Sequence, residues 1–289
     1  MLHVIIRENF QQAASLIQAE RMSHYKIEAA TGQHIGDRDE QQDRVALFAA
    51  PRAPGYMMAV LADGRGAGVG GSQAAEQVIR TAKQVFDQFS PLTDDVDAML
   101  AAIAQEAHTM ISLVRITSGE RPQSTMVALV ISADGVAHWA HAGNSRLYQF
   151  SGPNPVFRTV DHSYREKLIA DGNLAPDDHS GEKLSHLLIN TLGAAGETVS
   201  VTTGRYDGLK VGDSFLLCSD GLSPYFSDAE LGAAIGMRTP RESSEMLIAK
   251  TRERSAGRRA DNCSLALVRL IAPPVEKKDY KAQGIRRAV

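Results

Sequence analysis

The chain has 289 residues, of which 43% are hydrophobic and 22% are charged, and its formal net charge at pH 7 is −3. This composition is typical of a globular protein in water, and the length suits one large domain or two small ones. The small negative charge gives no general attraction to nucleic acid, and no apolar run approaches the roughly 18 residues that a membrane span needs. We therefore expect no nucleic-acid partner and no membrane span.

The two cysteines, Cys218 and Cys263, lie too far apart in the sequence to form a short metal-binding pair. Two buried, reduced thiols are the simplest interpretation, and they favour a reducing, cytoplasmic location. The N-terminal stretch carries Arg7 and Glu8 inside its only apolar part, which argues against a secretory signal.

Apolar periodicity predicts a helical extension over residues 1–24, followed by the body of the protein from about Tyr25. The first part of the body is expected to form two strands and then two helices, at 45–49, 56–62, 72–89 and 94–116. Asp94 is a candidate N-cap for the second helix.

The middle of the chain changes to the period of strands. Three successive strands are expected, at 126–131, 136–142 and 146–150. The residues between them, Asp134-Gly135 and Gly143-Asn144, are typical of hairpin turns, so the three strands are predicted to form a meander. A polar, irregular stretch follows, with short helices expected near 164–171 and 182–188.

The last third alternates strands and helices again. Strands are expected at 198–206, 214–219 and 263–270, and helices at 227–235 and 241–254. Residues 272–289 carry five Lys or Arg side chains and are expected to form a basic, mobile tail. Antiparallel strands interrupted by paired helices indicate one α+β layered domain.

Carboxylates follow two of the apolar strand patterns. Asp63 and Asp220 each end such a pattern, and each is followed by a glycine that lets the backbone turn. A single Asp-Gly pair is usually only a turn signal, but the two together with Asp43 and Asp261 suggest a carboxylate cluster. An all-oxygen site without Cys or paired His disfavours zinc and favours Mg²⁺ or Mn²⁺.

Other polar residues near these aspartates are open to two interpretations. Arg38 precedes Asp43 and can fork two hydrogen bonds onto a phosphate, although such a charged run is more often a solvated loop. The glycine-rich loop 64–71 packs tightly around Asp63 or is simply flexible, and it lacks the Gly-Lys-Ser/Thr ending of a phosphate-cradling loop. His141 and His162 are candidate acid or base groups, but the strand pattern around His141 favours a structural role.

The motifs occur in a fixed order: Arg-x4-Asp, a strand ending in Asp-Gly-x-Gly, Ser-Thr before a strand, Ala-His-x-Gly-Asn-Ser-Arg, Asp-His-Ser, Cys-Ser-Asp-Gly-Leu, and Asp-Asn before the last strand. Each motif is weak alone, but the ordered set resembles the metal-dependent serine/threonine protein phosphatases of the PPM family, type 2C, in their bacterial branch. The resemblance covers residues 25–271. It implies a four-layer α/β/β/α sandwich of two antiparallel sheets flanked by helix pairs, with metals at one end.

The resemblance also implies an activity: metal-dependent hydrolysis of phosphoserine and phosphothreonine in proteins by a metal-bound hydroxide, with two Mn²⁺ or Mg²⁺ ions. Arg38 would bind the substrate phosphate, and Asp63 would bridge the ions. The implied metal ligands are four carboxylates and one backbone carbonyl, those of Asp43, Asp63, Asp220 and Asp261, and of Gly64. Expected partners are a phosphorylated protein, namely a Ser/Thr kinase or its targets.

Three positions depart from the family pattern. Asn144 and Pro224 stand where many relatives carry aspartates of a third, weaker metal site, so we expect the third ion to be weakly bound or absent. Arg65 replaces a histidine that is proposed as the general acid in eukaryotic relatives, which leaves the acid unassigned. Residues 163–198 fall where the family has a variable flap beside the active site, a place where loops can gate substrates.

Two alternative functions follow from these departures. A degenerate PPM-fold protein that binds a signal or acts as a scaffold is suggested by the missing third-site carboxylates. The retained Arg38 and the four aspartates argue against it. An unrelated metal hydrolase of small phosphoesters is disfavoured by the ordered motifs.

Overall fold

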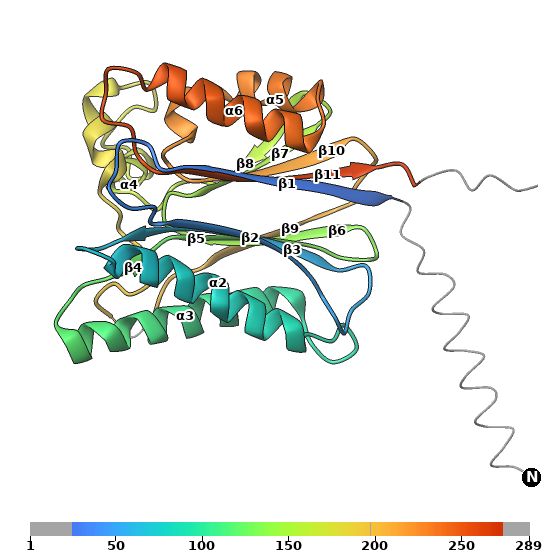
Figure 1. Cartoon of the computed structure of the whole chain (residues 1–289), viewed down its shortest axis with the longest axis horizontal. Helices are drawn as coiled ribbons and strands as arrows, with labels where there is room; N and C mark the ends of the chain where they lie inside the picture. The colour runs from blue at the N-terminus through green and yellow to red at the C-terminus, as the bar shows by residue number, and fades with distance from the viewer. Residues whose placement is uncertain (1–24, 197, 274–289) are drawn as a thin grey trace, which may run out of the picture.

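The computed structural model describes residues 25–196 and 198–273. Two antiparallel sheets pack face to face, and each is covered on its outer face by a pair of helices (Figure 1). This is the four-layer α/β/β/α sandwich expected from the sequence. The expected helix at 1–24 and almost all of the expected tail at 272–289 lie outside the described residues.

Sheet 1 contains both ends of the described chain. Its strand order is β1 (Lys26–His34), β11 (Cys263–Ile271), β10 (Asp213–Cys218), β7 (Arg146–Ser151) and β8 (Asn154–Arg158). Strand β1 pairs with β11 along its whole length, so the first and last strands close one edge of the domain together. Strands β1 and β8 were not predicted from the sequence.

Sheet 2 is built around a long hairpin. Its order is β2 (Asp43–Ala49), β3 (Met57–Arg65), β5 (Met126–Ile131), β6 (Val136–Ala142) and β9 (Thr202–Asp207), and the short β4 (Gln123–Ser124) pairs with the end of β3. Strand β3 continues beyond its expected end, through the Asp-Gly pair to Arg65, because β4 gives it a partner there.

Helices α2 (Gly70–Gln88) and α3 (Val96–Ser118) cover sheet 2, while α5 (Asp228–Gly236) and α6 (Pro240–Arg254) cover sheet 1. The N-cap of α3 is Asp95, whose side chain accepts the amide of Ala98 at 2.8 Å. The expectation that Asp94 caps this helix is wrong, because its carboxylate instead accepts the amide of Ser90 in the preceding turn.

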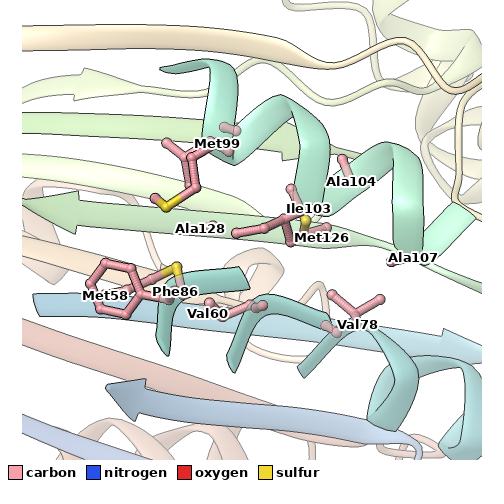
Figure 2. Packing of buried hydrophobic residues seen from close by; sticks show 14 of the residues in the cluster. Met58, Val60, Val78, Phe86, Met99, Ile103, Ala104, Ala107, Met126 and Ala128 are labelled. Carbon is pink, nitrogen blue, oxygen red and sulfur yellow. The ribbon is translucent and has the colours of Figure 1, made fainter. Parts of the chain in front are cut away.

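Three apolar layers fill the spaces between the four structural layers. One lies between the sheets, and one lies between sheet 1 and its helices. The third joins sheet 2 to α2 and α3, where Phe86 and Val78 of α2 and Ile103 of α3 meet Met58 and Met126 of the sheet (Figure 2). Burying such side chains contributes about 1.5–3 kcal/mol each to the stability of the fold. This stability offsets the cost of confining charged groups at the open end of the sandwich.

The predicted meander at residues 126–150 is wrong in its last step. Strands β5 and β6 form a hairpin in sheet 2, but β7 pairs with β10 in sheet 1. Gly143, with φ of +109°, carries the chain from one sheet to the other, and a Cβ there would lie 2.6 Å from the Thr125 side chain. Asn144 is therefore placed between the two sheets rather than in a hairpin turn.

The expected flap, residues 163–198, contains the short helix α4 (Tyr164–Ala170) and the 3-10 helix η1 (His179–His186). Its base is held by bridges between Ser163 and Leu188 and between Ser124 and Leu192. The second bridge ties the flap to β4, beside the end of β3. Among the described residues, no helix is both long and apolar enough to cross a membrane.

Candidate metal centre

The open end of the β2–β3 hairpin brings two carboxylates together. Asp43 and Asp63 are direct cross-strand partners, so their side chains leave the same face of sheet 2. Asp43 is almost completely buried, with 1% exposure, and its Oδ2 accepts the hydroxyl of Ser219 at 2.8 Å. Burial raises the pKa of Asp43 to about 7, and the charges of Asp220 and Asp261 add to the rise.

Asp63 lies in a tightly built backbone corner. Its amide donates to the hydroxyl of Thr125 at 2.9 Å, and its carbonyl accepts the Thr125 amide at 2.9 Å. Burial, together with the charges of Asp43 and Asp220, raises the pKa of the Asp63 carboxyl well above its ordinary value. At the next residue, Gly64, a Cβ would lie 2.0 Å from the carbonyl oxygen of Gly71, so no larger residue fits there.

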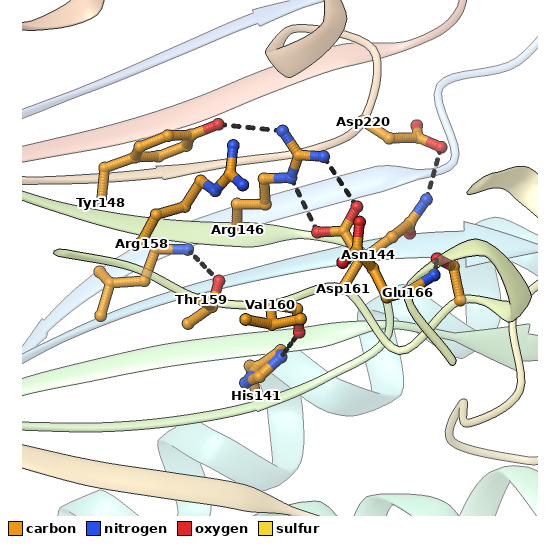
Figure 3. Close-up of polar contacts among 12 residues, drawn as sticks. His141, Asn144, Arg146, Tyr148, Arg158, Thr159, Val160, Asp161, Glu166 and Asp220 are labelled. Carbon is orange, nitrogen blue, oxygen red and sulfur yellow. Dashed lines mark hydrogen bonds and ion pairs between the residues drawn. The ribbon is translucent and has the colours of Figure 1, made fainter. Parts of the chain in front are cut away.

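Asp220 follows β10 on the opposite sheet, and its surroundings are different. Asn144 Nδ2 donates to Asp220 Oδ2 at 2.8 Å (Figure 3). His186 Nδ1 of the flap lies 3.8 Å from the same oxygen. Burial alone would raise the pKa of Asp220, but the nearby His186 and the hydrogen bond from Asn144 outweigh it and lower that pKa.

Asp261 and Arg38 contact each other directly. Arg38 Nη2 donates to Asp261 Oδ2 at 2.6 Å, and both side chains are nearly half exposed. The neighbouring Asn262 joins the two loops, because its Oδ1 accepts the amide of Gln42 and its Nδ2 donates to the carbonyl of Ile35, both at 2.7 Å. Through these two hydrogen bonds Asn262 supports the loop that carries Asp261.

These side chains border one cleft of about 640 Å³, which also receives Arg65, Arg259 and His186. Asp63, Gly64, Asp220, Asp261 and Arg38 all line it, and Asp43 lies directly behind Asp63. The flap residue His186 was not predicted as part of the site. Its position depends on packing between distant segments, for which the sequence carries no local signal.

The carboxylates suit hard divalent cations by their chemistry. As the side chains stand, no three His, Cys, Asp or Glu side chains within 25–196 and 198–273 surround a common point suited to an ion. Asp261 turns to Arg38, and Asp220 turns to Asn144. The pKa values of Asp43 and Asp63 are raised first by burial and then by neighbouring carboxylates, and a divalent cation would offset that cost. Rotation of the half-exposed Asp261 would complete an all-oxygen set.

His141 and His162 lie apart from this cleft. His141 is buried, and its Nε2 contacts the carbonyl oxygen of Val160 at 2.9 Å, while His162 contacts Asn190 and Thr202 (Figure 3 shows His141). Their rings are 4.3 Å apart, and burial together with His141 lowers the pKa of His162 to about 4. A structural role explains both better than acid–base chemistry.

No protein-family model matches the chain. Its sequence is similar to that of the serine/threonine phosphatase stp of Listeria innocua, with 27% identity over 215 residues, which are 72% of this chain and 82% of that protein. Its structure is similar to the S. agalactiae serine/threonine phosphatase, with a TM-score of 0.76 at 23% identity over 84% of this chain and 99% of that one.

A further similar structure is the catalytic domain of PstP, a phosphatase known from Mycobacterium tuberculosis, in complex with 2 manganese ions. Its TM-score is 0.68 at 24% identity, over 85% of this chain and 98% of that domain. These similarities support the expected resemblance of the chain to the bacterial PPM-type serine/threonine phosphatases.

The chain carries the carboxylates that the resemblance implies for two metal ions but lacks those of a third site. Asn144 directs an amide N–H at Asp220, which is a donor where a cation would need an acceptor. Pro224 lies exposed in the 3-10 helix η2 (Ser223–Tyr225) and offers no side-chain ligand. Both observations agree with the expectation that a third ion is weakly bound or absent.

Proposed function

We propose that this protein hydrolyses phosphoserine and phosphothreonine in protein substrates, using two Mn²⁺ or Mg²⁺ ions. The observation that carries the proposal is one cleft lined by Asp63, Asp220 and Asp261 together with Arg38, in which Asp43 is the cross-strand neighbour of Asp63. The similar proteins from Listeria and S. agalactiae are serine/threonine phosphatases, which supports the same reaction class.

The expected roles follow from the positions of the side chains. Asp43 and Asp63 on sheet 2, with the Gly64 carbonyl, and Asp220 and Asp261 on sheet 1 would hold the ions. Two ions at such a site lower the pKa of a shared water, so that hydroxide is available near neutral pH.

Arg38 would exchange its ion pair with Asp261 for the phosphoryl oxygens of the substrate. An exposed Arg–Asp pair is worth only about 0–1 kcal/mol, so this exchange is inexpensive. The planar guanidinium can donate two parallel hydrogen bonds to phosphate, which orients the phosphoryl group and neutralises the charge that develops on it.

A non-catalytic role as a signal-binding or scaffold protein is not favoured. Such a protein has no need for buried carboxylates that raise one another's pKa, because they destabilise the fold in the absence of a cation. The chain keeps this costly arrangement at Asp43 and Asp63, and only the third-site aspartates are missing.

The proposal is tested by Mn²⁺-dependent hydrolysis of a phosphothreonine peptide. Asp63→Ala and Asp220→Ala should each reduce kcat/KM by about a thousandfold or more, because each removes an expected ligand of the ions. Asp134→Ala is the matched control, since Asp134 is exposed in the β5–β6 turn far from the cleft. A wild-type protein without activity at any Mn²⁺ concentration would contradict the proposal.

We also propose that the physiological substrate is a Ser/Thr protein kinase or one of its targets, in the cytoplasm. The free, buried thiols of Cys218 and Cys263 support a reducing compartment. Phosphoproteomics of a strain that lacks the protein should show increased phosphorylation of kinase sites. An unchanged phosphoproteome would argue against this assignment.

A further inference from the structure

A second cavity, of about 540 Å³, adjoins the catalytic cleft on the side of the glycine-rich loop. Its charged lining side chains among the described residues are all arginines, namely Arg38, Arg65 and Arg121, and Gln42 and Gln123 complete the polar lining. Arg38 and Arg65 line the catalytic cleft as well, so the two cavities are continuous.

The arginines continue beyond this cavity. A further hollow is lined by Arg115, Arg121 and Gln123, together with small residues of the flap. Arg115 lies in the last turn of α3, and Arg121 lies in the loop that leads from α3 to β4. The residues Arg38, Arg65, Arg121 and Arg115, which we call the arginine groove, thus lead from the catalytic cleft toward the C-terminal end of α3.

The groove has a rigid floor. Arg65, the last residue of β3, is the direct cross-strand partner of Gln123 in β4. Gln123 Oε1 accepts the hydroxyl of Thr191 at 3.1 Å, which leaves its amide N–H groups as the donors available to a ligand. Gln42 Nε2 donates to the carbonyl oxygens of Gly66 and Gly68, so the glycine-rich loop is fixed against the same floor.

Three of the four arginines of the groove have no acidic partner among the residues that the structure describes. Within the described part of the chain, Arg65, Arg115 and Arg121 form no ion pair, and the carboxylate that pairs with Arg38 faces the catalytic cleft. The nearest acidic neighbour in sequence, Glu120, lies against Gly70 at the start of α2. In a protein of net charge −3, guanidinium groups gathered without acidic partners indicate an anion-binding surface.

We propose that the arginine groove binds a second phosphoryl group of the substrate, on a residue near the one whose phosphate enters the cleft. This inference rests on the proposed function and deepens it: the preferred substrates are multiply phosphorylated segments. A phosphoryl group carries a charge of about −1.5 to −2 and three acceptor oxygens, so it can satisfy two guanidinium forks at once, whereas a carboxylate accepts only one fork well.

The test compares phosphothreonine peptides that differ at one neighbouring position, which carries a second phosphothreonine, a glutamate or an alanine. The neighbouring position is varied on both sides of the scissile phosphate. For the best position, wild-type kcat/KM should be about tenfold higher for the doubly phosphorylated peptide, mainly through a lower KM. Arg121→Ala should reduce this ratio toward one, and Arg121→Lys should give an intermediate ratio. Combining Arg115→Ala with Arg121→Ala should reduce the ratio further.

Arg52→Ala is the matched control, because it removes an exposed arginine from the β2–β3 loop at the opposite end of the hairpin and should leave the ratio unchanged. Equal kcat/KM for all peptides in an active wild-type enzyme would overturn the proposed role of the groove while leaving the proposed function intact. A ratio that survives in the Arg115/Arg121 double variant, or an equal gain from glutamate, would also overturn it. If no peptide is hydrolysed, the proposed function fails and the inference fails with it.

Discussion

The Asp-Gly pairs at the ends of β3 and β10 occupy similar places on opposite sheets, yet their electrostatic environments differ in sign. Asp63 lies beside Asp43, and its pKa is raised by burial and by its acidic neighbours. Asp220 accepts a hydrogen bond from Asn144 and lies near His186, and its pKa is lowered. One sheet thus keeps its carboxylates uncompensated for a cation, while the other supplies protein donors of its own.

The two strand ends share a steric requirement. A Cβ at Gly64 would lie 2.0 Å from the carbonyl oxygen of Gly71, and a Cβ at Gly221 would lie 1.9 Å from the carbonyl oxygen of Asn262. In both places another backbone segment approaches so closely that only glycine fits. The backbone of the site is therefore equally rigid on both sheets, and only its charges differ.

The largest effect is expected from the feature that the two ends share. Gly64→Ala and Gly221→Ala should each lower the free energy of unfolding by about 3 kcal/mol or more, because the new methyl overlaps backbone atoms that cannot move cheaply. Chemical denaturation measures this loss. Gly70→Ala, where a Cβ meets nothing closer than 3.5 Å, is the control and should be nearly neutral. A strong loss at only one of the two sites would break the steric equivalence.

Replacing Asp63 or Asp220 by Asn should change the free energy of unfolding by a smaller amount, with opposite signs at the two positions. In the metal-free protein, Asp63→Asn should raise the free energy of unfolding by about 1–2 kcal/mol, because it removes one of two confined carboxylates. Asp220→Asn should lower it by about 1–2 kcal/mol, because it weakens charge-assisted hydrogen bonds. Denaturant titrations in a chelator measure both changes, and changes of the same sign would contradict the proposed contrast.

The stability of the protein should depend on pH through His162, which contacts Gly143 next to Asn144. His162, which accepts a contact from the amide of Gly143, has its pKa lowered to about 4, so the folded protein keeps it neutral. The unfolded chain binds the proton on His162 more readily than the folded protein does. The stability gained from neutral His162 is therefore complete above about pH 6.5 and is lost as the pH falls toward 4. Denaturation curves between pH 7 and about 4.5 should show the loss, and His162→Gln should reduce it. His34→Gln, remote from His141, is the control.

The smallest effect is expected from restoring the third-site carboxylates. Asn144→Asp combined with Pro224→Asp should raise Mn²⁺-dependent kcat by less than about tenfold, and only at high Mn²⁺. Counting ions in crystals soaked in Mn²⁺ should give two per chain in the wild type and a third in the double variant. A well-occupied third ion beside Asn144 in the wild type would show that the amide does not exclude it.

The interior strands could be predicted because their apolar runs have strong local signals, as at Met126–Ile131, which is confirmed to the residue. Edge strands could not. Strand β8 is exposed along its whole length and contains Pro155, and β1 mixes polar and small residues, so neither shows a clear alternation. The change of sheet at Gly143 was also missed, because a glycine turn looks the same in sequence whether it closes a hairpin or crosses between sheets.

The positions of Asp63, Asp220, Asp261 and Arg38 in one cleft follow from the motif order, and the structure brings them together. Their partners did not follow from the sequence. The hydrogen bond from Asn144 to Asp220 joins residues far apart in the chain, and so does the contact between His186 and Asp220. Such pairs depend on how the sheets and the flap pack.

The distribution of the aspartates over both sheets has a mechanical consequence. An ion held by Asp63 of sheet 2 and Asp220 of sheet 1 would be a removable cross-link across the mouth of the sandwich, added to hydrogen bonds such as those between Ser219 and Asp43 and between Asn262 and Gln42. The stability of that end would then rise with the logarithm of the free metal concentration. Falling metal levels would loosen the mouth first while the opposite end stays packed, so that amide exchange near the cleft would report the supply of metal to the enzyme.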